Sequence, residues 1–227
     1  MPVIRRSYDR LVPELWRQRV HLARGGTDVF LPCFRETGSI QIHVPKAAGT
    51  SLSHALYGGN VGHRTALDYH RISARHFRTY FRFGFVRNPW DRAVSAYEFA
   101  RSGGTEWVRP IPDPVYGSDT FATFGRFVEE WLVTAPLTEV DVVFRPQWTF
   151  LCDPDGDLLV DHVGRIERLA DDLQVVESAL GRTIRPDHLN QTERSVDYPD
   201  YYTPETRDMV AEVYRRDIEL FDYEFAR

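Results

Sequence analysis

Two segments of the chain share one order of elements, a short apolar strand, a loop and then a helix. The run SIQIHV at residues 39–44 is apolar and β-branched, which predicts a buried strand, and a helix is predicted at 49–57. The run FRFGFV at 81–86 predicts a second strand, and the proline beyond it starts a helix at 89–100. Because strands that alternate with helices build a largely parallel sheet, we predict an α/β fold with a central, mainly parallel sheet flanked by helices.

The rest of the chain predicts further helices, loops and two weaker strand segments. A length of 227 residues corresponds to one domain, so we expect residues 1–227 to form a single domain with a helical N-terminal extension at 1–38. Helices are predicted at 8–24, 65–78, 119–133, 167–180 and 204–220, a loop at 102–118, a polar and aromatic connection at 182–203, a possible strand at 140–144, and a hairpin whose turn at 152–157 leads into a second arm at 158–160.

Charge and composition argue against several classes of protein. The formal net charge of −5 argues against a general nucleic-acid binder. The longest apolar runs are far shorter than the roughly 18 residues that a membrane span needs. No apolar stretch follows the charged N-terminus as it would in a signal peptide. Cys33 and Cys152 are too few for a disulfide framework or a zinc site. We therefore expect a cytoplasmic protein with two free thiols, no membrane anchor and no metal site.

Lysine is nearly absent from the sequence. Of the 28 basic residues, 27 are arginine, and the one lysine is Lys46. An ammonium group is a compact point charge with rotatable donors, which a planar guanidinium cannot replace at close range. We infer that Lys46 is retained for a chemical reason, although a single lysine can also remain on a surface by chance.

The segment PKAAGTS at 45–51 connects the first predicted strand to its helix. A glycine near a helix start lets backbone N–H groups close on an anion, and the helix dipole favours negative charge there. Lys46 adds a cation, and Thr50 and Ser51 add hydroxyl donors. The segment therefore predicts a phosphate-binding loop, although it lacks the Walker spacing because the lysine precedes the glycine. The alternative is an ordinary capped helix after a strand, with Ser51 as a surface hydroxyl.

The second predicted strand leads into another cationic segment. Arg87 lies where the strand ends, and Ser95 lies eight residues further on, about two helical turns along the helix. The guanidinium and the hydroxyl could both reach one phosphate. The alternative is that Arg87 pairs locally with Asp91 and that Ser95 packs. Together the two loops predict two anion sites at the carboxyl ends of two strands, and they suit a nucleoside with a phosphate at each end.

Both segments resemble motifs of sulfotransferases that use 3′-phosphoadenosine 5′-phosphosulfate (PAPS). PKAAGTS is similar to the 5′-phosphosulfate loop of the carbohydrate branch, PKxAGTS, and RNPWDRAVSAY is similar to the 3′-phosphate motif, RxPxxRxxSxY. Their order, spacing and strand–loop–helix context all agree with that family. Weaker similarity continues through GRIERL at 164–169, HLN at 188–190 and a YxxDxxxFxY pattern at 214–223, so the resemblance covers residues 39–225.

The resemblance implies a P-loop-like fold, PAPS as co-substrate and 3′-phosphoadenosine 5′-phosphate (PAP) as product. Lys46 would contact the bridging oxygen and stabilise the departing phosphate, while Arg87 and Ser95 would hold the 3′-phosphate. A sulfuryl group carries less charge than a transferring phosphoryl group, so fixed cations and N–H donors can suffice without a metal. The resemblance places Ala47, Ala48, Gly49, Thr50 and Ser51 around the 5′ end of the nucleotide, and Thr192, Arg194, Tyr201 and Tyr202 in a loop near it.

An acceptor hydroxyl must lose a proton as it attacks, and histidine is the default base near neutral pH. His63 is our candidate, because GHRTALDY at 62–69 resembles a GHxSxxDF stretch of glycosaminoglycan 2-O-sulfotransferases in which the histidine is the base. His43 lies in a predicted buried strand, which favours a core residue with its hydrogen bonds satisfied, and His54 could face either way on the first helix. The alternative bases are His70, Asp68 and Glu98.

The acceptor is poorly specified by the sequence. Aromatic and basic residues that suit a sugar or an aromatic ring occur in two places, but they are more typical of a helix interface. We predict transfer to a hydroxyl of a sugar or another small molecule. A nucleotide kinase or NTPase is one alternative, which magnesium-dependent ATP turnover would favour. A catalytically silent nucleotide-binding module is the other, against which Lys46 and His63 argue. The residues considered for binding the acceptor substrate are Trp107, Tyr116, Arg145, Gln147 and Trp148.

Overall fold

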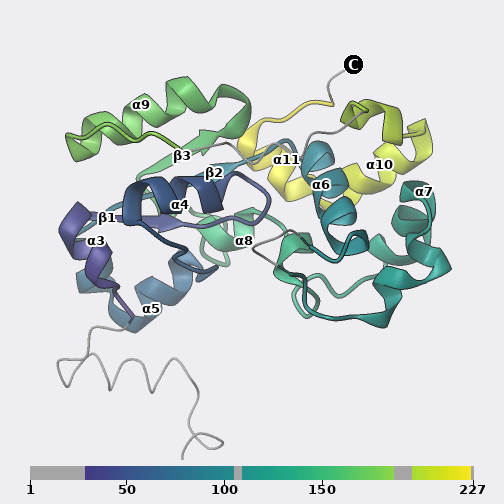
Figure 1. Cartoon of the computed structure of the whole chain (residues 1–227), viewed down its shortest axis with the longest axis horizontal. Helices are drawn as coiled ribbons and strands as arrows, with labels where there is room; N and C mark the ends of the chain where they lie inside the picture. The colour runs from purple at the N-terminus through teal and green to yellow at the C-terminus, as the bar shows by residue number, and fades with distance from the viewer. Residues whose placement is uncertain (1–28, 105–108, 187–195, 226–227) are drawn as a thin grey trace, which may run out of the picture.

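The computed structural model describes residues 29–104, 109–186 and 196–225 (Figure 1). Its centre is one sheet of three parallel strands in the order β1-β2-β3, with helices on both faces. The predicted α/β class and the parallel sheet are therefore confirmed. The strands are β1 (Ser39–Ile42), β2 (Phe81–Val86) and β3 (His162–Arg165).

The central strand β2 is covered on both of its faces. Phe83 and Phe85 pack in a cluster with residues of α4 (Gly49–Tyr57) and α9 (Leu169–Leu180). On the other face, α8 (Trp148–Leu151) approaches so closely that a Cβ on Gly84 would lie 2.6 Å from Leu151. Burial on both faces explains why β2 is an almost continuous apolar run rather than an alternating one.

Local signals define the helices that follow the first two strands. Helix α4 ends at Gly58, which adopts a left-handed conformation with φ 74°. Helix α6 (Pro89–Arg101) begins with a proline in its first turn, and the Asn88 side chain accepts a hydrogen bond from the Trp90 N–H. Both helices agree with their predicted bounds. Two further helices near the sheet are α3 (Pro32–Thr37) and α5 (Ala66–Phe77).

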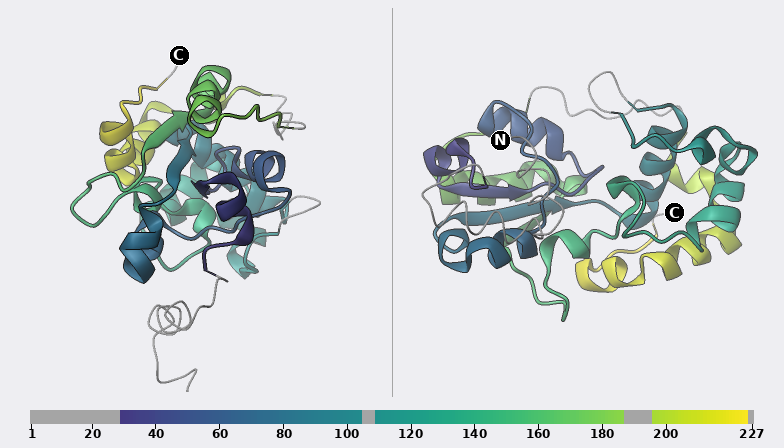
Figure 2. Two further views of the ribbon diagram at one scale, coloured as in Figure 1. Left: turned by 90° about the vertical axis from the view of Figure 1, so that its left-hand side faces the viewer. Right: turned by 90° about the horizontal axis from the view of Figure 1, so that it is seen from below.

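The carboxyl ends of the parallel strands face one end of the molecule. Helices α6, α7 (Phe124–Arg126) and α10 (Pro204–Val213) gather there (Figure 2). Aromatic side chains from this region pack on one another, for example Tyr97 on Phe127 with ring centroids 5.2 Å apart. The two predicted anion loops both begin at this end, since each follows a strand directly.

Several predicted elements were wrong in kind or extent. Residues 140–144 do not form a strand, because the Asp141 side chain accepts from the Val143 N–H and starts the 3₁₀ turn η4 (Val142–Phe144). The turn at 152–157 is present, but the second arm at 158–160 is reduced to one bridge between Cys152 and Leu158. The third strand is instead β3, which the sequence analysis did not predict.

Two long predicted helices are broken, and some predictions lie outside the described residues. Residues 204–220 divide at Tyr214 into α10 and α11 (Arg215–Phe221). Residues 119–133 form 3₁₀ helix η2 (Asp119–Phe121), α7 and π-helix η3 (Phe127–Leu132). Short 3₁₀ turns are η1 (Pro114–Gly117), η5 (Ile166–Arg168) and η6 (Tyr198–Tyr201). The helix predicted at 8–24 and residues 187–195 of the connection predicted at 182–203 are outside the described residues.

Two expectations about the chain's class can be compared with the structure. Cys33 and Cys152 are both free thiols. Across the described ranges, no helix combines the length and the apolar character that crossing a bilayer requires.

Candidate active site

The loop between β1 and α4 has an unusual backbone. Lys46 and Ala48 have φ values of 66° and 56°, and within the described residues only Asp222 shares this left-handed conformation among non-glycine residues. Left-handed residues that alternate with right-handed ones turn successive N–H groups toward one side, which makes a concave anion-binding nest. Ala48 stands at the N-cap of α4, and its methyl group cannot accept a hydrogen bond from the helix. The left-handed residues on either side of Ala47 and the N-cap without a side-chain acceptor are the features expected of such a nest.

The loop is held from both sides by polar contacts. The Gly49 carbonyl accepts hydrogen bonds from Gln41 Nε2 (3.1 Å) and from Ser53 Oγ (2.7 Å). Arg87 Nη1 lies 3.4 Å from the Lys46 carbonyl oxygen. The strand before the loop, the helix after it and the second predicted anion segment therefore all contribute to its shape.

Arg92 connects the two loops through buried hydrogen bonds, although it was not among the predicted site residues. Arg92 as a whole is 1% exposed. Nε donates to the carbonyl of Pro45 (3.0 Å), and Nη2 donates to the carbonyls of Val143 (3.0 Å) and Arg145 (2.6 Å). The signal for it was present as the second arginine of RNPWDR, but its acceptors are carbonyls that the sequence does not connect to it.

Lys46 extends toward α6. Its Nζ lies 4.4 Å from the centroid of the Phe99 ring, a distance that allows a cation–π interaction. Ser95 lies on the same helix and is 4% exposed. Of the other predicted loop residues, Ala47, Gly49 and Ser51 are buried, and Thr50 is half-buried.

Arg87 makes the local pair that the sequence analysis kept as an alternative. Its Nε lies 2.6 Å from Asp91 Oδ2, and Ser95 packs in the interior. The backbone of Arg87 is fixed by the buried Gln147, whose Oε1 accepts from the Arg87 N–H (2.9 Å) and whose Nε2 donates to the Arg87 carbonyl (2.8 Å). A guanidinium has five N–H donors, so these contacts leave Arg87 capacity for a further anion.

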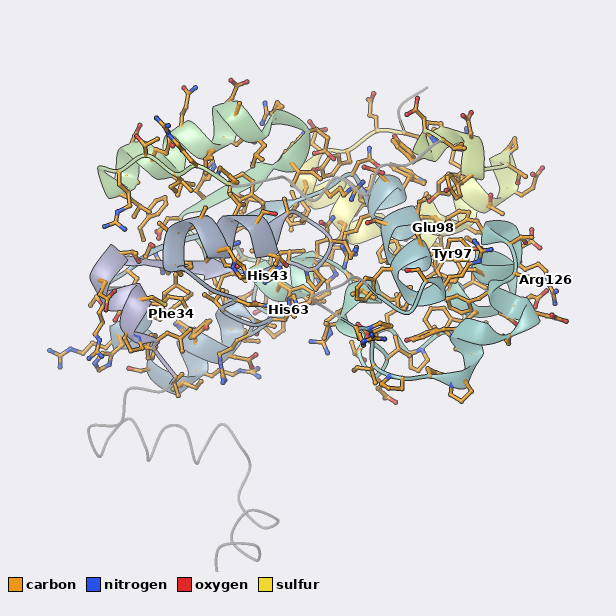
Figure 3. All side chains as sticks on the ribbon, in the orientation of Figure 1. Phe34, His43, His63, Tyr97, Glu98 and Arg126 are labelled. Carbon is orange, nitrogen blue, oxygen red and sulfur yellow. The ribbon has the colours of Figure 1, made fainter. Side chains whose placement is uncertain are left out.

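His63 lies against His43, the residue that directly follows β1 (Figure 3). Their ring centroids are 4.2 Å apart, and His63 Nδ1 lies 3.0 Å from the His43 carbonyl oxygen. The His43 ring in turn covers Gly49, where an added Cβ would overlap its Cδ2 and Nε2 atoms. The structure therefore brings His63 to the anion loop through a single intervening residue.

Both imidazoles are held neutral at pH 7. Burial is the main cause that lowers the pKa of His63, and the hydrogen bond to the His43 carbonyl and the charge of Asp141 oppose it in part. Burial, together with the neighbouring His63, lowers the pKa of His43 to about 3. A neutral imidazole can accept a proton, so His63 has the protonation state that a general base needs.

The alternative bases have other partners. Asp68 belongs to the capping box of α5, where its side chain accepts from the Thr65 N–H (3.2 Å). Glu98 lies on α6, where Tyr201 Oη approaches its Oε1 at 3.4 Å. His70 packs edge-on against Phe77. His54 is exposed on α4.

The residues considered for binding the acceptor substrate contact mostly other parts of the protein. Tyr116 is buried and packs against Phe121. Arg216 lies over the Trp148 ring at 3.8 Å. Arg145 Nη2 donates to the Thr138 carbonyl (3.2 Å). These contacts agree with the interpretation that the residues belong to an interface between helices. The predicted residues Trp107, Thr192 and Arg194 lie outside the described residues.

The C-terminal helices connect to the second loop. Asp217 on α11 is fully buried, and its two carboxylate oxygens accept from the N–H groups of Gln147 and Trp148, each at 2.8 Å. Gln147 in turn holds Arg87. On α10's N-terminal side, Tyr202 Oη donates to the Trp90 carbonyl (2.9 Å). Asp217 of the YxxDxxxFxY pattern therefore supports the segment that begins at Arg87, through the side chain and main chain of Gln147.

Comparison with known proteins agrees with this arrangement. A family model described as the sulfotransferase family matches residues 38–224, which include both loops, His63 and the C-terminal pattern. Comparisons with curated proteins and with solved structures gave no significant match. The family match covers most of the sequence, and the chain therefore belongs to the sulfotransferase family.

Proposed function

We propose that the protein transfers the sulfuryl group of PAPS to the hydroxyl of a sugar or another small molecule. Family membership supports sulfuryl transfer in general. The observation that carries the choice of donor is the pairing of two anion loops. The left-handed turns at Lys46 and Ala48 open onto the start of α4, and Arg87 reaches the same loop through the Lys46 carbonyl.

In this proposal the loop residues 46–51 hold the 5′ end of the nucleotide. Their N–H groups and the dipole of α4 stabilise the negative charge that develops on the departing 5′-phosphate. Lys46 supplies the compact cation next to the bridging oxygen. Arg87 and Ser95 hold the 3′-phosphate, and the Gln147 side chain keeps the Arg87 backbone in place.

The transfer step needs a base for the acceptor. The acceptor oxygen forms a bond to sulfur, the bond between sulfur and the bridging oxygen breaks, and its electron pair stays on the 5′-phosphate of PAP. His63 takes the acceptor proton at Nε2. A carbonyl oxygen can only accept a hydrogen bond, so the contact with the His43 carbonyl assigns the ring hydrogen of His63 to Nδ1 and leaves Nε2 as the basic atom.

The experiment is a transfer assay with purified protein, sulfur-labelled PAPS and a panel of hydroxyl acceptors. We expect labelled product with at least one acceptor and much less of it with the variant Lys46→Arg. ATP with labelled terminal phosphate and magnesium is run in parallel. Transfer or hydrolysis of that phosphate, with no sulfuryl transfer, would favour the kinase or NTPase alternative. PAP binding without any transfer would favour the silent module.

A further inference from the structure

We propose that His43 is a positioning residue for the transfer, whose ring and carbonyl group hold His63 in a fixed position relative to the loop at 45–51. The inference rests on the proposed function, because it concerns the base of that reaction. A place in a predicted buried strand favours a core residue here, with its polar atoms satisfied. The structure confirms that His43 is buried, but its ring lies between the loop and the candidate base, and its Nδ1 has no hydrogen-bond partner within the described residues.

The first observation is the contact with the loop. His43 is 3% exposed, and its ring occupies the space in which a Cβ on residue 49 would lie. Gly49 does not have a positive φ, so its backbone does not require glycine. The absence of a side chain at 49 is therefore needed for the His43 ring, which fixes the distance between the ring and the start of α4.

The second observation is the contact with the base. The two imidazole rings are tilted by 46° with centroids 4.2 Å apart, and the main chain of His43 accepts the Nδ1 hydrogen of His63. His43 thus touches His63 with both its ring and its carbonyl group. A residue that contacts the base twice and the loop once restricts how far His63 can move relative to a bound nucleotide.

The third observation concerns the polar atoms of His43. Its ring is neutral, and one of its two ring nitrogens, the buried Nδ1, has no hydrogen-bond partner within the described residues. The groups that act on the pair are Asn60, which hydrogen-bonds His43, Asp141, which favours protonated His63, and the two imidazoles themselves. A neutral ring beside the α4 N-terminus adds no charge that would compete with Lys46 for the anion. Its contribution is therefore shape rather than charge.

The test compares His43→Ala, Gly49→Ala and the double variant. Without the ring, His63 can shift and water can reach it, so we expect kcat of His43→Ala to fall about 10- to 100-fold while the Kd for PAP changes less than about threefold. The lower limb of the kcat pH profile should move up toward the ordinary histidine value of 6.5, because the burial that lowers the His63 pKa is weakened.

The glycine variant provides the matched control. Gly49→Ala forces the His43 ring out of its place, so it should weaken PAP binding and lower kcat. Adding His43→Ala removes the overlap and should restore PAP binding, while kcat stays as low as in His43→Ala alone. Should His43→Ala unfold, His43→Gln fills more of the space and is measured in the same way.

The titration of the His63 imidazole by NMR gives a readout that does not need turnover. Its signals are assigned by their loss in His63→Ala, and we expect its pKa to rise in His43→Ala. An unchanged pH profile and an unchanged His63 titration would overturn the proposal, as would equal losses of PAP binding and kcat in His43→Ala. A wild-type protein without sulfuryl transfer would refute the proposed function instead, and the titration would still test the contact.

Discussion

Replacing Arg92 with methionine removes the buried cation that joins the two loops. The side chain keeps a similar length, but three carbonyl groups lose their donor, those of Pro45, Val143 and Arg145. Asp217 also loses the positive neighbour that favours its ionised form. Because the Pro45 carbonyl directly precedes Lys46, we expect the substitution to loosen the anion loop as well as to destabilise the fold.

The size of the effect follows from burial. A hydrogen bond from a charged group is worth about 1.5–3 kcal/mol, but part of that sum is offset because the variant no longer buries a cation. Removing one member of a buried charged network typically costs about 3–5 kcal/mol, and we expect Arg92→Met to lose that much of the free energy of unfolding. A domain of this kind has about 5–15 kcal/mol in total, so the loss is a large fraction.

The loss should also depend on pH. Burial raises the pKa of Asp217 from its ordinary 3.8 to about 6, so the folded state binds more protons than the unfolded state between these values. Its contribution to stability therefore falls as pH rises from 3.8 to about 6 and is constant above that. Arg92 opposes this shift, so removing it raises the folded pKa further. The destabilisation by Arg92→Met should be larger at pH 8 than at pH 5.

The assay is urea unfolding at both pH values. Arg126→Met is the matched control, since Arg126 pairs with Glu130 on the surface at the outer edge of the molecule (Figure 3). We expect its unfolding midpoint to equal that of the wild type within error. A loss of less than about 1 kcal/mol in Arg92→Met, or equal midpoints for both variants, would refute the reasoning about the buried network.

Two further predictions concern the residues of the proposed chemistry. Lys46→Arg should abolish most turnover while much of the PAP binding remains, because arginine keeps the charge but not its compact geometry; steady-state kinetics and calorimetry measure the two, and normal turnover would contradict the role. His63→Ala should lower kcat by roughly 10²–10⁴ with little change in PAP affinity and should remove the lower limb of the pH profile, whereas near-normal turnover together with an inactive His70→Ala or Glu98→Gln would move the role of base elsewhere.

The first two strands and their helices could be predicted because their signals are local. Gly58 ends α4, and the proline in the first turn of α6 lies three residues after the end of β2. The missed strand β3 has no such signal. Val163 is the one apolar side chain of the four residues in β3, and Gly164 is needed because the Phe85 ring of the neighbouring strand fills the space of a side chain. That requirement exists only once β2 and β3 are paired.

The loops of the site could likewise be predicted, but their supports could not. PKAAGTS contains its own glycine, lysine and hydroxyl groups within seven residues. Arg92, by contrast, is recognisable only through carbonyl acceptors 47 to 53 residues away in the chain. Asp217 binds the main chain of Gln147 across 70 residues. Buried polar networks of this kind depend on how separate segments meet, and a single sequence does not display that.

The most direct measurement of the central claim is calorimetry of the wild-type protein with PAP and with AMP, which differ in the 3′-phosphate. Each charge-assisted contact from Arg87 or Ser95 to that group should be worth about 1.5–3 kcal/mol. We therefore expect PAP to bind at least about tenfold more tightly than AMP. Arg87→Met should remove most of the difference while AMP affinity stays near its wild-type value. Equal affinities of the wild-type protein for the two nucleotides would contradict the account.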